Sequence, residues 1–318
     1  MRQTSASLRL SVLVALIAIA SAGCDAATAA GAAGRQAAAR TAAKPEPAQT
    51  PSAVTDEAAV ERQRKVIDRE IASLGAHPWA ADYYQGDGLG ANIRLSLAPA
   101  GGVVATWHGC MGLYGANRGK VVERDGALRF EYAASNAPGF GGFPEAVHPV
   151  RWGARRYLIP ESKLVDFVNA VHRGFEPRHD VHGMFLLAEG DEKRPVGGLP
   201  TLPPEVLALL RRQPLEVSVR SVDGVEVKHE QMASLGCNHI YRVTLDRGSR
   251  DRLAPGMALT RVSPTSTATT AEVLSVTPDS ATAKVVGLFE DCKRPKTVPV
   301  VGWRFTTGAY DPAKAASH

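Results

Sequence analysis

The segment TWHGCMGLYG, residues 106–115, places a histidine and a cysteine two positions apart. An imidazole beside a thiol can lower the thiol pKa and so create a nucleophile. If residues 103–110 form a strand, the side chains of His108 and Cys110 lie on one face of it. A thiol enzyme also needs an orienting amide or carboxylate and an oxyanion hole, and no pattern marks either. We therefore expect Cys110 to be a buried structural cysteine or half of a disulfide, with catalysis by His108 and Cys110 as the alternative.

A second candidate for chemistry is the segment EPRHDVHG, which carries His179 and His182. On a helix this spacing would put both imidazoles on one side, as a metal site requires. Pro177 before them and Gly183 after them favour a turn instead. The sequence contains neither an HExxH motif nor a pair of CxxC motifs. We expect a solvated loop and no cofactor, with a metal site at His179 and His182 as the alternative.

Three alternating glycines occur in YYQGDGLGAN, residues 83–92. A dinucleotide-binding fingerprint needs the spacing G-x-G-x-x-G between a strand and a helix. Here the spacing differs and a strand pattern follows, so we expect a tight loop that enters β-structure.

The first 24 residues have the composition of an export signal. Arg2 and Arg9 precede the apolar run LRLSVLVALIAIA, and small residues follow, which predicts a signal peptide over residues 1–23. The segment SAGC resembles the lipobox of bacterial lipoproteins, although Ser21 stands where that motif usually carries Leu, Val or Ile. The resemblance implies that Cys24 is lipidated and anchors the chain to a membrane on the periplasmic side of the cell envelope. A signal peptide in which Cys24 is incidental is the alternative.

Residues 24–54 are almost entirely Ala, Gly, Thr, Gln and Pro, with no large apolar run that could bury a core. This composition predicts a disordered tether. As a random coil it would reach roughly 30 Å.

Three cysteines remain if Cys24 carries lipid: Cys110, Cys237 and Cys292. They allow three single bridges, each of which leaves one thiol over. Cys237 and Cys292 both fall in the second of two predicted domains, so we predict a disulfide between them.

The elements that position these residues begin with a helix. Residues 55–74 carry Val60, Ile67, Ile71 and Leu74 at helical spacing opposite a charged face, which predicts an amphipathic helix packed by one narrow stripe. A helix that binds a partner is the alternative.

The rest of the first predicted domain, residues 55–214, is β-rich. ANIRLSLAP and VVATWHGC alternate with period two, GLYGAN is typical of a turn, and GKVVERDGALRFEYA predicts a hairpin with Asp125 and Gly126 at its tip. SKLVDFVNAVHRG predicts a helix with Ser162 as N-cap and Gly174 as its end. We expect an antiparallel meander or small barrel with packed helices.

Residues 215–310 contain short β-rich runs separated by turns, which predicts a second, all-β domain that forms a small barrel; residues 311–318 are expected to fray. The segment RGSRDRLAPGMALT resembles a turn in β-barrel modules of envelope scaffold proteins, with Arg252 in place of the usual glycine. The resemblance implies a barrel and no activity. The overall fold class is thus mainly β with a few helices.

The motifs YYQGDGLGAN, WHGCMGLYG, WGARRYLIP and GFEPR resemble a set found in uncharacterised bacterial exported proteins, to which no activity is attached. The chain has 37 Lys and Arg against 32 Asp and Glu, and the two signs are interspersed, which argues against nucleic-acid binding.

We therefore expect a non-enzymatic envelope lipoprotein with a binding or scaffolding role, whose partners are the membrane and envelope proteins. The alternatives are a hydrolase or metal-dependent enzyme that uses His108 and Cys110 or His179 and His182, and a carrier of a small apolar ligand or lipid.

Overall fold

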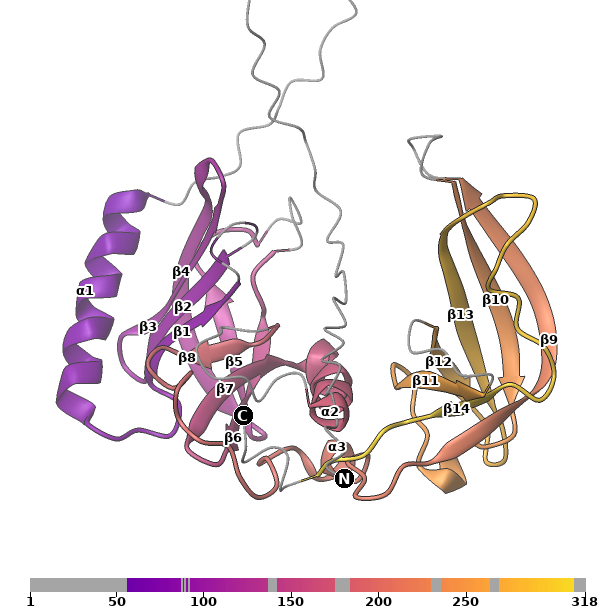
Figure 1. The fold of residues 1–318 in the computed structure, drawn as a ribbon. Helices are drawn as coiled ribbons and strands as arrows, with labels where there is room; N and C mark the ends of the chain where they lie inside the picture. The colour runs from indigo at the N-terminus through magenta and orange to yellow at the C-terminus, as the bar shows by residue number, and fades with distance from the viewer. Residues whose placement is uncertain are drawn as a thin grey trace, which may run out of the picture. The chain divides into compact units, whose positions relative to one another are not determined.

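The chain forms two closed antiparallel β-barrels with few helices, which confirms the predicted fold class (Figure 1). The computed structural model describes residues 56–86, 88, 90, 92–136, 142–174, 184–229, 236–263 and 269–311. The predicted signal peptide, the tether, His179 and His182 lie outside them. Within the described part of the chain, no helix has the length and apolar character needed to cross a membrane.

The first barrel is an eight-stranded meander in which each strand pairs with the next along the chain. It closes where Tyr83 and Tyr84 of β1 pair with Ala188 and Leu187 of β8. Its strands are β1 (Ala81–Gln85), β2 (Asn92–Ala98), β3 (Gly102–Gly109), β4 (Gly112–Arg124), β5 (Ala127–Tyr132), β6 (Ala146–Trp152), β7 (Arg155–Pro160) and β8 (Leu186–Ala188). The predicted hairpin is confirmed, because Asp125 and Gly126 join β4 to β5 with φ angles of 54° and 75°.

Every second residue of β2 and β3 points into this barrel and contributes to its core. Leu95 and Leu97 of β2 are fully buried, and so are Val103 and Ala105 of β3, which lie opposite them. Between β1 and β2, the predicted loop is held by Asn92, whose side-chain oxygen accepts hydrogen bonds from the Tyr84 hydroxyl at 2.6 Å and the Gly88 N–H at 2.7 Å.

The helix α1 (Glu57–Leu74) packs against β2, β3 and β4 (Figure 1). Asp56 caps its start by accepting from Ala58 N at 3.1 Å. The predicted apolar stripe is confirmed at Val60 and Ile67, which are buried, but is wrong at Leu74, which is 38% exposed. Ile71, in the same turn, is partly buried and packs against the core cluster.

The side of α1 that faces the barrel is held by polar contacts as well as by Ile67. The Gln63 amide donates to the carbonyl oxygens of Gly101 and Gly119 at 2.9 and 2.7 Å. A Cβ at Gly101 would lie 2.9 Å from Ile67 Cγ1, so the β2–β3 turn approaches the helix as closely as it does because residue 101 is glycine.

A second core cluster joins the helix α2 (Leu164–Arg173) to strands β6, β7 and β8, around Trp152, Tyr157 and Phe167. The predicted end of α2 at Gly174 is confirmed, with φ 67°. The predicted N-cap at Ser162 is wrong, because Ser162 lies in a 3-10 turn, η1 (Glu161–Lys163), and Lys163 takes the cap position. The short helix α3 (Pro204–Leu207) packs with α2.

The second barrel has six strands in the order β10-β13-β12-β11-β14-β9, and β9 pairs with β10 to close it. The strands are β9 (Glu216–His229), β10 (Cys237–Leu245), β11 (Ala258–Ser263), β12 (Thr270–Val276), β13 (Ala281–Glu290) and β14 (Arg304–Thr306). Val243, Leu245 and Phe305 are fully buried in its core. A 3-10 turn, η3 (Ser249–Asp251), precedes Arg252, which adopts the left-handed conformation with φ 58°. The related turns in envelope scaffold proteins usually carry glycine at this position, and glycine adopts this conformation more readily.

The two barrels fall within the predicted domain ranges 55–214 and 215–310, and all described residues belong to one compact unit, Thr50–His318. That the two barrels are separate domains stays a prediction.

Candidate functional site

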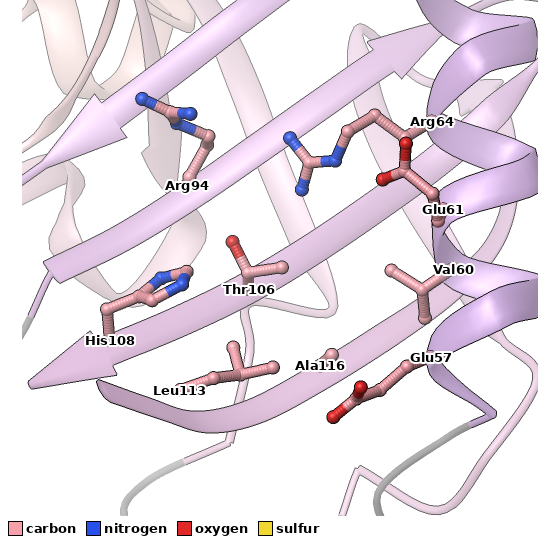
Figure 2. Close-up of a pocket in the computed structure, with 9 residues that line it drawn as sticks. All are labelled: Glu57, Val60, Glu61, Arg64, Arg94, Thr106, His108, Leu113 and Ala116. Atoms are coloured by element: carbon pink, nitrogen blue, oxygen red, sulfur yellow. The ribbon is translucent and has the colours of Figure 1, made fainter. Parts of the chain in front are cut away.

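A pocket of ≈ 400 Å³ lies between the first half of α1 and the outer face of strands β2, β3 and β4 (Figure 2). It contains His108, the histidine that the sequence marks as a candidate. The pocket is lined by Glu57, Val60, Glu61, Arg64, Arg94, Thr106, His108, Leu113 and Ala116.

The strand register brings the sheet residues of this pocket together. Arg94 of β2 lies opposite Thr106 of β3, and Thr106 lies opposite Ala116 of β4. Two residues after Thr106 in β3, and on the same face, His108 lies opposite Leu113 of β4. Because side chains of paired residues project to the same side of a sheet, these five residues form two adjacent rows on the outside of the barrel.

The helix contributes a matching row. Glu57, Val60, Glu61 and Arg64 are spaced at i, i+3, i+4 and i+7, which places them on one side of α1. The burial of Val60 and Ile67 fixes which side faces the sheet. Arg64 Nη1 reaches the sheet directly and donates to Ser96 Oγ at 3.4 Å.

Hydrogen-bond donors converge in the middle of the pocket. Figure 2 shows the Thr106 hydroxyl directed toward the space between the guanidinium groups of Arg64 and Arg94. Thr106 is 5% exposed, and among the described residues its hydroxyl has no hydrogen-bond partner. Buried hydroxyls are normally hydrogen-bonded, so an unpaired one that faces a pocket marks a place where a ligand atom or water completes the bond.

The charges around this point are mixed. The guanidinium of Arg94 also pairs with Glu189 on the sheet side, with Nη2 2.9 Å from Oε1. Glu57 and Glu61 are exposed at the helix side, whereas Leu113, Ala116 and Val60 provide apolar surface. A guanidinium has five N–H donors in a plane, so an arginine that makes one contact can still bind a carboxylate or phosphate oxygen. The arrangement therefore suits a small ligand that has an anionic group beside an apolar part.

Cys110 lies outside this pocket, in the turn between β3 and β4. It is the free cysteine among Cys110, Cys237 and Cys292 and it is exposed, so the expectation of a buried or bridged Cys110 is wrong. Its Sγ lies 3.6 Å from the Tyr114 hydroxyl. Because β3 ends at Gly109, Cys110 is not part of the strand. The prediction that Cys110 and His108 share one face of a strand is therefore wrong.

The predicted turn GLYGAN is also wrong, because residues 112–117 belong to β4. Residues 110 and 111 make the turn instead, and Gly112 follows with φ 109°. The glycines made this segment resemble a loop. Pairing with β3, including an irregularity between Trp107 and His108, overrides that local preference.

His172, which precedes the segment of His179 and His182 in the sequence, is buried in α2. Its Nε2 accepts a hydrogen bond from Arg211 N at 2.9 Å. Burial, assisted by the charges of Arg211 and Arg173, lowers the pKa of His172 to about 4. The ring is therefore neutral at physiological pH and acts as an acceptor in the core.

The predicted disulfide between Cys237 and Cys292 is confirmed, with the two Cα atoms 5.0 Å apart. It joins the start of β10 to the segment that follows β13. A histidine that the sequence analysis did not single out lies beside it, with His229 Nδ1 3.2 Å from Cys237 Sγ. Residue 229 lies opposite residue 237 in the β9–β10 ladder, so the strand register brings His229 to the disulfide.

Comparisons of the chain with family models, with curated proteins and with solved structures find no match.

Proposed function

We propose that the protein is a non-enzymatic binding protein of the bacterial cell envelope, held at a membrane by lipid on Cys24, and that the pocket beside α1 binds a small anionic ligand. The observation that carries the binding role is the buried, unpaired hydroxyl of Thr106, directed between the guanidinium groups of Arg64 and Arg94.

The donor set supports an anion as the ligand. A carboxylate or phosphate oxygen at the centre of the pocket would accept from the Thr106 hydroxyl and from one or both guanidinium groups, and charge-assisted bonds of this kind are the strongest hydrogen bonds in proteins. His108 at the rim can donate from its ring, and Leu113 offers apolar contact next to it. Glu57 and Glu61 restrict the site, because a large anion would approach their carboxylates.

The sequence features of the N-terminus support the envelope location. The predicted signal peptide, the lipobox-like SAGC and the predicted tether of residues 24–54 support export of the domain and its attachment at a distance from the membrane surface. The disulfide between Cys237 and Cys292 agrees with an oxidising compartment.

The inward-facing residues of the first barrel favour this pocket over an internal ligand site. Tyr83, Leu95 and Leu97 are fully buried and belong to one continuous core cluster. Side chains that fill a small barrel in this way leave ligand binding to its outer surface and loops.

The proposal is tested by calorimetric titration of the full-length protein with inorganic phosphate and with succinate. We expect at least one of these to bind, and the Arg64→Gln/Arg94→Gln variant to lose binding. Arg69→Gln is the matched control, because Arg69 lies on α1 and is exposed, donating to Lys65 O at 3.0 Å within the helix. Equal affinities for the wild type, the double variant and the control would refute a role for this pocket.

A further inference from the structure

A second group of side chains, with atoms that can bind a metal, lies where β9 ends and β10 begins. One nitrogen of His229 and the sulfur atoms of Cys237 and Cys292 all lie within 4.8 Å of one another. His229 Nδ1 is 3.2 Å from Cys237 Sγ and 3.9 Å from Cys292 Sγ. An imidazole and two thiolates are ligands that Zn²⁺ favours, and all three can reach one ion once the two sulfur atoms are no longer bonded to each other.

The backbone that carries these groups is held by contacts other than the disulfide. His229 and Cys237 are fixed by their pairing in the β9–β10 ladder. Glu290 organises the segment after β13: its Oε1 accepts from Thr297 Oγ1 at 2.6 Å and its Oε2 accepts from Lys296 N at 3.1 Å. These contacts do not involve the S–S bond, so we expect Cys292 to stay close to the other two groups when that bond is absent.

The residues around Cys292 add to this support. Asp291 Oδ1 accepts from the N–H groups of Lys293 and Arg294 at 2.8 and 2.9 Å, which folds the chain tightly after the cysteine. The buried His239 has its Nε2 3.4 Å from the carbonyl oxygen of Cys292. Outer contacts of this kind orient metal ligands and strengthen binding.

We propose that His229, Cys237 and Cys292 form a Zn²⁺ site when the disulfide is reduced. A dithiol supplies two electrons and two protons to the S–S bond, which breaks to give two protein thiols, while the dithiol becomes a cyclic disulfide. Zn²⁺ then binds both sulfur atoms and the His229 nitrogen, and the two thiol protons leave to solvent. The fourth position is taken by water.

The two states exclude each other, because the same two sulfur atoms make either the disulfide or the bonds to the metal. Both hold the start of β10 to the segment after β13, so the fold is maintained in either state. His229 and Cys292 are exposed, which gives the ion a path from solvent, whereas Cys237 is fully buried.

The test uses full-length protein that carries Cys110→Ser, so that the exposed thiol of Cys110 does not bind metal. The protein is reduced with dithiothreitol, freed of it without oxygen, and titrated with Co²⁺, whose charge-transfer band in the near ultraviolet reports thiolate ligands. We expect one Co²⁺ per reduced chain, its displacement by Zn²⁺, and no band in the oxidised protein.

Two variants locate the site. Cys292→Ser should abolish the band. Loss of a residue that only supports a metal ligand can weaken metal binding by roughly 100-fold, so His229→Ala, which removes a ligand itself, should weaken Co²⁺ binding by at least as much. His148→Ala, which removes a histidine of the first barrel, is the control and should leave binding unchanged.

The proposal is overturned if the reduced protein shows no band, or if either variant binds Co²⁺ like the parent. It is also overturned if circular dichroism shows that reduction alone unfolds the second barrel, because the site requires the segment after β13 to stay in place without the disulfide.

Discussion

Arg94 of β2 and Thr106 of β3 lie directly opposite each other on the outer face of the first barrel, and the pocket beside α1 opens over both. The register of β2 against β3 thus places the charged donor of Arg94 beside the unpaired, buried hydroxyl of Thr106. Arg64 of α1 approaches the same point from the helix.

Replacing Thr106 by Val separates ligand binding from stability. The variant keeps the shape of the side chain and removes a buried hydroxyl that has no partner among the described residues. We expect the free energy of unfolding to stay the same or to rise by about 1 kcal/mol, since an unsatisfied buried polar group is costly. Phosphate or succinate binding should weaken in the same variant. Urea denaturation and calorimetry measure the two quantities, and a clear loss of stability would show that the hydroxyl is satisfied in the folded protein.

Gly101 controls how closely α1 approaches the barrel. In Gly101→Ala the new methyl group would press on Ile67 of the helix, so we expect a loss of about 1–3 kcal/mol in the free energy of unfolding. Because α1 forms one wall of the pocket, ligand binding should also weaken, although no lining residue is changed.

The matched control is Gly197→Ala, because a Cβ at Gly197 meets no atom within 4 Å. Chemical denaturation should show little change for this variant. Equal effects of the two substitutions would argue against tight packing of α1 on the β2–β3 turn.

His172 should make the stability of the protein depend on pH. Its pKa is lowered to about 4 in the folded state by burial, and the unfolded value is about 6.5. Between these values the unfolded chain takes up a proton that the folded chain does not. The stabilisation from neutral His172 is therefore complete above about pH 6.5 and is lost as the pH falls toward 4, by up to about 3 kcal/mol.

The variant His172→Gln isolates this effect, because a side-chain amide oxygen can still accept from Arg211 N. Urea denaturation at several pH values between about 7 and 4 should give a shallower loss of stability for the variant than for the wild type. Identical pH profiles would mean that His172 is not the group responsible.

The disulfide should contribute strongly to the stability of the second barrel. It closes a loop with a sequence separation of 55 residues, for which the chain-entropy model gives about 4 kcal/mol. We expect Cys237→Ala/Cys292→Ala to lose an amount of this order in chemical denaturation, and added reductant to have no further effect on it. Cys110→Ala is the control and should change stability little, because Cys110 is free and exposed.

The proposed lipid anchor makes a prediction about location. If Cys24 is lipidated, Cys24→Ser should move the protein from the membrane fraction to the soluble periplasmic fraction, and the full-length protein should lose its mass increment for acyl chains. An unchanged membrane fraction would refute lipid on Cys24 as the anchor.

Local patterns in the sequence were sufficient to predict most elements of the fold. Apolar residues recur at every second position, at Ile93, Leu95 and Leu97, as a strand requires, and the Asp125–Gly126 pair adopts positive φ angles at low cost. The strands and the β4–β5 hairpin could therefore be predicted. The pairing of Cys237 with Cys292 followed from their shared position in the second β-rich region.

The candidate sites depend on contacts between residues that are distant in sequence, and local patterns do not encode these. His108 was recognisable by its type, but its neighbours in the pocket come from β2 and from α1. They become neighbours through the register of β2 against β3 and the packing of Ile67 on Gly101. A shift of one residue in that register would turn Arg94 and Thr106 to opposite faces of the sheet.

The same reason explains the errors. Glycines near Cys110 favoured a long turn, yet the pairing of β4 with β3 extended the strand and left Cys110 exposed at a short turn. His229 joined the two cysteines only through the β9–β10 ladder. By itself the sequence determined most of the segments that become strands and helices, because side-chain alternation and turn preferences act over a few residues. Only the tertiary structure decided which side chains meet, because barrel closure and strand register are set by the packing of the whole core.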